Sequence, residues 1–315
     1  MKTQDLRIAV LCGGHGSEAS VSRSSGAEVF AALRVSSSQV EMFDMAREDV
    51  LPAIRTWRPD VVFPVLHGGT GENGTLQGWL EIERIPYVGS GILSSAVCMN
   101  KQFAKYVLQA HNLSTPKGVV VEDYSPERAS EIVRTLGESI VVKPTSEGSA
   151  LGVHFCDGER SLDNVLRTEL LEHPKSLLVE ERVKGKEITV GLLESPDLIA
   201  FPIIEIVTPQ GSWYDFEHRY TPGLSEHVIP AQLAPEVSSS VVQDCLKTFR
   251  VLGCRDLARV DLIVTDEGRA VILEVNTLPG MTPTSLYPDG ARAYGIDFES
   301  LVYRLATHAS TRSFQ

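Results

Sequence analysis

Several features that mark other classes of protein are missing from this chain of 315 residues. No apolar span is long enough to cross a membrane, and the apolar run near the N-terminus is too short for a signal peptide, so we expect neither membrane insertion nor export. The five cysteines are scattered, odd in number and lack CxxC spacing, which favours a reducing cytoplasm over a disulfide framework or a zinc site. No long cluster of lysine and arginine offsets the formal net charge of −12, which argues against a general nucleic-acid binder.

What is present indicates a soluble α/β protein of more than one domain. The chain exceeds the usual size of a single hydrophobic core, and 43% hydrophobic with 22% charged residues is an ordinary globular composition. A buried-strand run at 6–12, a glycine-rich turn and an amphipathic helix at 21–33 form a Rossmann-like start. Further parallel strands are predicted at 61–67 and 85–89.

The pattern changes near residue 100 and again after the apolar strand at 177–183. The middle segment has a predicted helix at 103–111, a second helix after Ser125, and strands at 118–122, 139–144 and 150–155. The last segment contains a strand at 188–194, the aromatic and charged stretch 212–227, and a helix at 241–252. We therefore predict three domains, which cover residues 1–99, 100–182 and 183–315.

The stretch from Ala258 to Thr282 reads as two strands around a turn. Alternation puts Arg259 and Asp261 on one face of the first strand, and Glu274 and Asn276 on one face of the second. If the hairpin pairs around its Asp-Glu-Gly turn, these four side chains converge. The two carboxylates and the asparagine then supply oxygen ligands that suit Mg²⁺ held together with ATP phosphates, and the arginine would neutralise phosphate or a developing oxyanion. The alternative is a surface hairpin with solvated charges, but both strands are too apolar for an exposed ribbon.

Two glycine-rich segments follow predicted strands in the first hundred residues. In GGHGSEASVS, the glycines permit a tight turn into a helix, and Glu18 would suit an ammonium group; alternatively Glu18 or Ser17 caps the helix. HGGTGENGTLQGWLE packs five glycines into a short loop, which allows close backbone approach to a ligand. His67 begins that loop at the carboxyl end of a strand, where open α/β sheets bind ligands.

Two further segments suggest a nucleotide site. Lys143 ends a strand, and the loop from Thr145 to Ser149 offers backbone N–H groups beside it, as in a phosphate clamp that is not a P-loop; the alternative is a hairpin with a surface lysine. Glu180 and Glu181 close an apolar strand whose edge can meet an adenine. Glu187 follows where it could hold ribose hydroxyls, although either glutamate alone is more often a solvated charge.

Taken together and in order, these segments resemble the D-alanine:D-alanine ligases of the ATP-grasp superfamily over nearly the whole chain. The most specific pieces are HGGTGENGTLQGWLE, IPYVGSGILSSAVCMNK, VVKPTSEGS, YDFEHRY and LEVNTLPGMTPTSL. The resemblance implies a cytoplasmic, homodimeric, three-domain ATP-grasp enzyme that makes D-alanyl-D-alanine for peptidoglycan precursor synthesis. ATP would lie between the central and C-terminal domains, with two Mg²⁺ ions for which Mn²⁺ may substitute.

The same resemblance assigns roles to individual residues. Lys101 and Lys143 match the phosphate-contacting lysines. The nucleotide pocket is matched by Glu180, Val183 and Glu187, and the metal ligands by Asp261, Glu274 and Asn276. The site of the first D-alanine is matched by Glu18, His67, Ser149 and Tyr220. Arg259 and the Gly280 N–H resemble the oxyanion contacts, and Ser285 and Leu286 resemble the receptors of the second carboxylate.

The implied reaction has two steps. The carboxylate of the first D-alanine attacks the γ-phosphate of ATP to give an acyl phosphate, and the neutral amine of the second D-alanine then attacks the acyl carbon. Because water would hydrolyse the acyl phosphate, the stretch from Ser212 to His227 is a candidate lid.

The chain departs from the family pattern at several positions. Ala19 and Ser20 replace the usual Arg-Glu pair after Glu18, Ala150 replaces a second serine, and Arg219 stands where the lid has a lysine and keeps the charge for a phosphate contact. Two alternatives therefore stay open. One is an ATP-grasp ligase that joins other amino or hydroxy acids, and the other is a nucleotide-binding regulator without catalysis, against which the intact metal and oxyanion residues argue.

Overall fold

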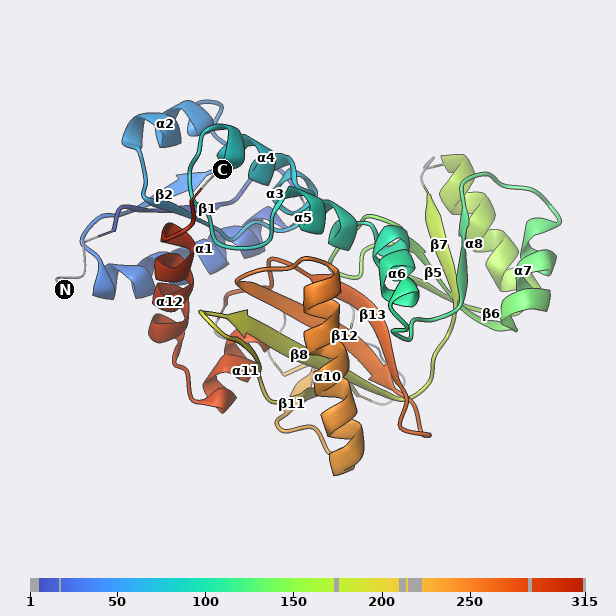
Figure 1. The fold of residues 1–315 in the computed structure, drawn as a ribbon. Coiled ribbons are helices and arrows are strands. Elements are labelled where there is room, and N and C mark those ends of the chain that lie inside the picture. The colour runs from blue at the N-terminus through green and yellow to red at the C-terminus, as the bar shows by residue number, and fades with distance from the viewer. Residues whose placement is uncertain are drawn as a thin grey trace.

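The structure is a computed structural model that describes residues 6–16, 18–172, 176–209, 214, 223–282 and 285–313. Three sheets follow one another through the molecule, from the N-terminal sheet on the left of Figure 1 to the sheet of the middle segment on the right. The sheet between them carries the predicted metal hairpin. Helices α5 (Ile92–Met99) and α6 (Lys101–Ala110) connect the N-terminal sheet to the middle segment.

The N-terminal sheet is parallel and buried on both faces. Its strands, in the order β2-β1-β3, are β1 (Ile8–Cys12), β2 (Val40–Asp44) and β3 (Val61–Pro64). Its helices are α1 (Ala19–Ser36), α2 (Val50–Trp57), α3 (Gly69–Glu72), α4 (Thr75–Ile82) and, from the end of the chain, α12 (Phe298–Ser310). Alternate residues of β1 enter different cores: Ile8 and Val10 pack with α1 and α12, whereas Ala9 and Leu11 pack with α2 and α4. Burial on both faces explains the continuous apolar run read from the sequence.

Two parts of the N-terminal prediction differ from the structure. Residues 85–89 do not form a full strand, and only Val62 and Tyr87 make a parallel bridge there. The segment from His67 to Glu81 is not a loop throughout, because α3 and α4 occupy most of it. Its glycines mark the turns into these two short helices: Gly68, Gly69 and Gly74 have φ of 68°, 51° and 93°.

The sheet of the middle segment is antiparallel and covered on one face by two helices. The strands, in the order β4-β7-β5-β6, are β4 (Gly118–Val121), β5 (Ser139–Pro144), β6 (His154–Asp157) and β7 (Leu177–Glu181), and the helices are α7 (Arg128–Leu136) and α8 (Glu159–Glu172). Strand β6 begins four residues later than predicted. Ser149, Ala150 and Gly152 have φ of 47°, 59° and 67°, which a strand cannot accommodate.

The third sheet runs through the centre of the molecule with α10 against one face (Figure 1). Its strands are β8 (Lys186–Glu194), β9 (Leu198–Ala200), β10 (Ile204–Val207), β11 (Glu226–Val228), β12 (Leu257–Val264) and β13 (Ala270–Asn276), and its helices are α10 (Pro235–Val251) and α11 (Leu286–Tyr294). The predicted hairpin is confirmed: β12 pairs with β13 in antiparallel register, with Arg259 opposite Asn276 and Asp261 opposite Glu274.

The last helix of the described chain completes the core of the first segment. Leu301 and Leu305 of α12 are fully buried in one cluster with Val29 and Leu33 of α1. The three domain boundaries read from the sequence stay a prediction, and residues after 297 share their core with residues before 34.

Asp256 ties three distant parts of the chain together at the start of β12. Its carboxylate is fully buried, accepts the Gly89 N–H at 2.7 Å and accepts Arg312 Nη2 at 2.6 Å. His308 of α12 lies 3.8 Å away. A buried carboxylate without these donors would be strongly unfavourable, so the contacts hold the N-terminal segment, the central sheet and the C-terminal segment in one arrangement.

We predict that Asp256→Ala lowers the free energy of unfolding by about 3 kcal/mol, because it leaves Arg312 without its buried partner. Urea denaturation followed by circular dichroism measures the change. Asp49→Ala is the control, since the Arg47 and Asp49 side chains of that ion pair are 60% and 65% exposed. That variant should lose at most about 1 kcal/mol, and equal losses in the two variants would contradict the role of Asp256.

Candidate active site

The hairpin β12–β13 holds a buried arginine against a buried aspartate. Arg259 donates from Nε to Asp261 Oδ1 and from Nη2 to Asp261 Oδ2, both at 2.8 Å. Thr189 of β8 donates to the same Oδ1 at 2.6 Å. Burial would lower the pKa of Arg259, but the paired Asp261 carboxylate outweighs it and raises the pKa, so this guanidinium stays charged. The fork fixes the two side chains in one geometry.

A β-bulge changes the direction of the hairpin beside this pair. Asp261 lies opposite Glu274, but the next residue, Leu262, lies opposite Ile272, so Leu273 is the extra residue of β13. Bulges re-aim side chains and are common next to active sites. Here Leu273 and Glu274 both line the same cavity, although they are consecutive in a strand.

The larger of two neighbouring cavities, about 500 Å³, lies between the sheet of the middle segment and the central sheet. Most of the residues predicted to bind nucleotide, phosphate or metal line it: Lys101, Lys143, Glu180, Glu181, Val183, Glu187, Asp261 and Glu274. Its volume falls in the range usual for small-molecule and cofactor sites. The structure thus brings these residues together from β5, β7, β8, β12 and β13.

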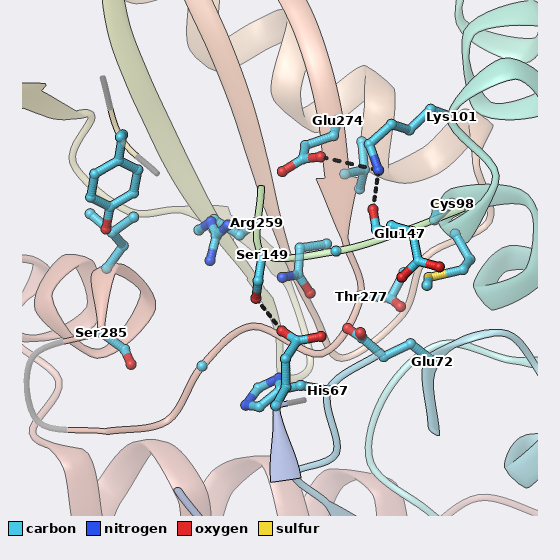
Figure 2. Close-up of a pocket in the computed structure, with 18 residues that line it drawn as sticks. His67, Glu72, Cys98, Lys101, Glu147, Ser149, Arg259, Glu274, Thr277 and Ser285 are labelled. Atoms are coloured by element: carbon cyan, nitrogen blue, oxygen red, sulfur yellow. Dashed lines mark hydrogen bonds and ion pairs between the residues drawn. The ribbon is translucent and has the colours of Figure 1, made fainter. Parts of the chain in front are cut away.

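The smaller cavity adjoins the larger one and reaches the N-terminal segment (Figure 2). The residues predicted to contact the amino-acid substrates line it with Asn276: Glu18, His67, Ser149, Arg259, Gly280, Ser285 and Leu286. Lys101, Glu147, Tyr214 and Glu274 line both cavities. The two cavities therefore meet at Lys101 and Glu274, whose charged atoms are 3.7 Å apart.

Lys143 is not a surface lysine, because only 9% of the residue is exposed. Its Nζ lies 2.8 Å from Glu180 Oε2, and Lys105 Nζ lies 2.6 Å from Glu180 Oε1. Burial would raise the pKa of Glu180, but the two ammonium groups, Lys143 first, hold it below its usual value. Glu180 is thus an ionised residue that positions Lys143 in the cavity wall.

Glu18 does not cap α1 with its side chain, although it occupies the N-cap position. Its Oε1 instead accepts a hydrogen bond from Ser149 Oγ, so the turn before α1 meets the loop between β5 and β6. Gly68 lies close to the same carboxylate, because a Cβ added there would come within 2.9 Å of Glu18 Oε2. The functional interpretation of Glu18 is therefore favoured over the capping interpretation.

His67 follows β3 and lines the smaller cavity. Burial, and next the positive charge of Arg259, lower its pKa to about 4, so the imidazole is neutral at neutral pH. Its Nε2 is buried and has no hydrogen-bond partner in the described part of the chain. A buried polar atom in this state is suited to a polar group of a ligand.

Four residues that were not predicted individually also line the smaller cavity: Glu72, Cys98, Glu147 and Tyr214. The alternation of side chains along a strand could not predict these residues. Glu72 and Cys98 lie on helices, and Glu147 and Tyr214 lie on connections between elements. Two predicted residues, Arg219 and Tyr220, lie outside the described residues, as does most of the lid stretch. Of that stretch, Glu226 and His227 belong to β11, which pairs with β10.

The predicted metal ligands offer oxygen atoms at the junction of the cavities. Asp261 and Glu274 are cross-strand neighbours, and Asn276 follows on β13. Within the part of the chain that the structure describes, no three His, Cys, Asp or Glu residues are grouped as a metal site. The predicted set has only two carboxylates and an amide, which suits a hard cation that takes its remaining ligands from a bound phosphate.

The comparisons with known proteins agree with this geometry. The family model described as the D-ala D-ala ligase C-terminus matches residues 107–307, and that of the D-ala D-ala ligase N-terminus matches residues 52–90. The chain is similar to a D-alanine–D-alanine ligase of Carboxydothermus hydrogenoformans, with 42% identity over 95% of this chain and 97% of that protein. It is also similar to one of Geotalea uraniireducens, with 42% identity over 98% and 97%.

Two solved structures have the same fold. The VanG D-Ala:D-Ser ligase of Enterococcus faecalis matches with a TM-score of 0.83 and 29% identity, covering 97% of this chain and 100% of that one. The D-alanine–D-alanine ligase of Bacillus anthracis complexed with ATP matches with a TM-score of 0.82 and 32% identity, covering 98% of both chains. The predicted ATP-grasp fold is confirmed. Among the described residues, no helix is long and apolar enough to span a membrane.

We predict that the His67 imidazole stays neutral from pH 8 down to about pH 5, because its pKa is lowered to about 4. Nuclear magnetic resonance of ¹⁵N-labelled histidine measures its titration, and His67→Gln assigns the signal. The unfolded chain binds this proton near pH 6.5 whereas the folded chain does not, so stability should fall as the pH drops through that window. A midpoint near 6.5 for His67 would contradict the described burial.

Proposed function

Because the chain belongs to the D-alanine–D-alanine ligase family, we propose that its two cavities join two D-alanine molecules at the expense of ATP. The enzyme is an ATP-dependent, ADP-forming ligase, and its product would serve peptidoglycan precursor synthesis. The observation that carries the proposal is the junction of the cavities at Lys101 and Glu274. There a nucleotide phosphate from one side meets a substrate carboxylate from the other.

In the first step, the carboxylate of the first D-alanine attacks the γ-phosphorus of ATP, the bond to the β-phosphate oxygen breaks, and an acyl phosphate and ADP form. Glu18, oriented by Ser149, binds the ammonium group of that substrate, and neutral His67 donates to its polar groups. Lys101 and Lys143 balance phosphate charge. Glu181, Val183 and Glu187, which line the larger cavity, bind the adenine and ribose.

In the second step, the amine of the second D-alanine attacks the acyl carbon, loses a proton and displaces phosphate. Nε and Nη2 of Arg259 are held by Asp261, which leaves Nη1 to stabilise the oxyanion together with the Gly280 N–H. Ser285 and Leu286 begin α11, where the helix N-terminus favours the carboxylate of the second substrate. Arg219, Tyr220 and the rest of the 212–227 stretch would cover the site, with Arg219 on phosphate and Tyr220 beside Glu18.

Asp261, Glu274 and Asn276 would hold Mg²⁺, two ions per site, with Mn²⁺ as a substitute. The carboxylate and amide oxygens at the cavity junction fit a hard cation shared with phosphate. When bound, the metal would neutralise charge on the transferring phosphoryl group. Lys101 lies beside Glu274, so the chain itself contributes one positive charge at the same place.

We propose two further properties from the resemblance: the enzyme acts in the cytoplasm and forms a homodimer. Exposed apolar side chains support the second, since Leu93, Phe103 and Tyr106 of the neighbouring helices α5 and α6 are 77%, 56% and 56% exposed. Light scattering after size exclusion would give the mass of the assembly, and a monomeric mass at micromolar concentration would exclude the dimer.

A second acceptor remains a specific alternative, because a D-Ala:D-Ser ligase is among the solved structures with this fold. The deciding experiment measures phosphate release from ATP and Mg²⁺ with D-alanine, L-alanine, D-serine, or D-alanine with D-lactate, and identifies each product by mass. Release with D-alanine alone that yields the dipeptide supports the proposal. Release only in the presence of D-serine or D-lactate would show that the acceptor site serves another substrate.

We predict that Arg259→Lys reduces kcat about 10²-fold, because it loses the oxyanion donor while keeping a positive charge next to Asp261. ATP affinity should change little, and fluorescence titration with a nucleotide analogue measures it. Arg255→Lys is the control, because Arg255 binds the Gly89 carbonyl outside both cavities. Unchanged turnover in Arg259→Lys would refute the oxyanion role.

We predict that Glu274→Gln raises the Mg²⁺ concentration for half-maximal activity at least about tenfold, because a carboxylate ligand is lost. Binding of Mn²⁺ with a nucleotide analogue, followed by electron paramagnetic resonance, checks the metal site directly. Glu205→Gln provides a control, because Glu205 lines the larger cavity but pairs with Lys186. Equal metal dependence in the two variants would exclude Glu274 as a ligand.

A further inference from the structure

Glu72 is a carboxylate in the smaller cavity that the reaction described above does not use. It ends α3, and Figure 2 shows its side chain pointing into the cavity, on the side of Thr277 and His67. Its Oε2 accepts the Gly68 N–H at 2.5 Å, and this is its only hydrogen bond within the described parts of the chain. Oε1 is therefore available to a ligand.

Glu72 and Glu18 meet at one glycine. Gly68 donates its N–H to Glu72 Oε2, and a Cβ added to Gly68 would come within 2.9 Å of Glu18 Oε2. Gly68 has a φ of 68°, so it provides both the turn and the space that lets the two carboxylates approach. Two carboxylates this close repel each other unless one is protonated or a cation lies between them.

The described residues around Glu72 do not place a cation between the two carboxylates, so a ligand can supply it. Glu18 and Glu274 face it with negative charge. Among the described residues, two cations line the same cavity: Arg259 is held by Asp261, and Lys101 is held by Glu274 and the Glu147 carbonyl. The helices packed against α3 add no positive charge: α5 contributes the Cys98 thiol, and the single charged residue of α4, Glu81, accepts a hydrogen bond from Tyr87. Neighbouring His67 is neutral.

We propose that Glu72 and Glu18 together bind the ammonium group of the first D-alanine, with Glu72 as the second carboxylate of that subsite. The inference rests on the proposed function and adds a residue to it. An ammonium group has three N–H donors, and Glu18 Oε1 is already engaged by Ser149. The carboxylates of Glu18 and Glu72 then accept one donor each.

This arrangement couples substrate binding to release of a proton. Burial, opposed by the Gly68 N–H and reinforced by Glu18, raises the pKa of Glu72 to about 8, so the free enzyme carries a proton there at pH 7. An ammonium group stabilises the ionised form, so the carboxyl group loses its proton to the buffer when D-alanine binds. Affinity should consequently rise with pH up to about pH 8 and no longer depend on Glu72 above it.

Calorimetric titration of D-alanine tests the proposal, with the full chain, Mg²⁺ and a non-hydrolysable ATP analogue at pH 7. The difference in binding enthalpy between two buffers of different ionisation enthalpy gives the number of protons released. We expect about one proton per D-alanine for the wild type. For Glu72→Gln we expect about none, with affinity weakened about tenfold by the lost charge-assisted hydrogen bond.

Glu83→Gln is the matched control, because Glu83 lies at the end of the next helix and pairs with Arg55 outside the cavity. It should behave as the wild type. Glu72→Asp keeps a carboxylate and should retain proton release with intermediate affinity. Binding of the ATP analogue by each variant reports that it has folded.

Wild-type binding without proton release, or unchanged affinity and proton release in Glu72→Gln, overturns the role of Glu72. If Glu72→Gln does not fold, the number of protons released by the wild type and by Glu72→Asp tests the role of Glu72 instead. A wild-type enzyme that neither binds nor ligates D-alanine overturns the proposed function as well. Binding and ligation that do not depend on Glu72 overturn this inference alone.

Discussion

The ion pair between Arg259 and Asp261 sets the geometry of both cavities. Both residues are almost fully buried in the central sheet, and the two hydrogen bonds between them leave little freedom in either side chain. Asp261 faces the larger cavity while Arg259 faces the smaller one. A buried pair of this kind is costly to break, so the spacing between a phosphate-binding region and an amino-acid-binding region is built into the centre of the fold.

The buried lysines show the same principle on the nucleotide side. Glu180 holds Lys105 and Lys143 at opposite oxygens, so a cluster of two cations and one anion carries a net positive charge at the cavity wall. An acidic chain of net charge −12 can thus present a local positive site for a polyanion. The smaller cavity is lined by charged residues of both signs, with Glu18, Glu72 and Glu274 beside Lys101 and Arg259. Both signs are useful there, because an amino acid carries an ammonium group and a carboxylate.

The sequence was sufficient to predict side-chain positions where the regular alternation of a strand determines them. Alternation along two apolar strands predicted that Arg259, Asp261, Glu274 and Asn276 converge, and the antiparallel register confirms it. The β-bulge at Leu273 was not predictable, because nothing in AVILEVN distinguishes a regular strand from one with an extra residue. Glu72 was missed for a related reason: its place in the cavity depends on a one-turn helix within a segment whose glycines indicate a loop. Contacts between distant segments, such as the one between Glu18 and Ser149, followed from the family resemblance and not from local pattern.

The packing of α12 on α1 has a consequence for how the chain reaches its active form. The segments that carry Glu18 and His67 precede the rest of the site in the sequence, yet one face of their core is closed by Leu301, Leu305 and Ala309. During translation this face stays uncovered until α12 has left the ribosome. The core behind the amino-acid-binding residues is thus closed only after the residues that line the larger cavity have been synthesised.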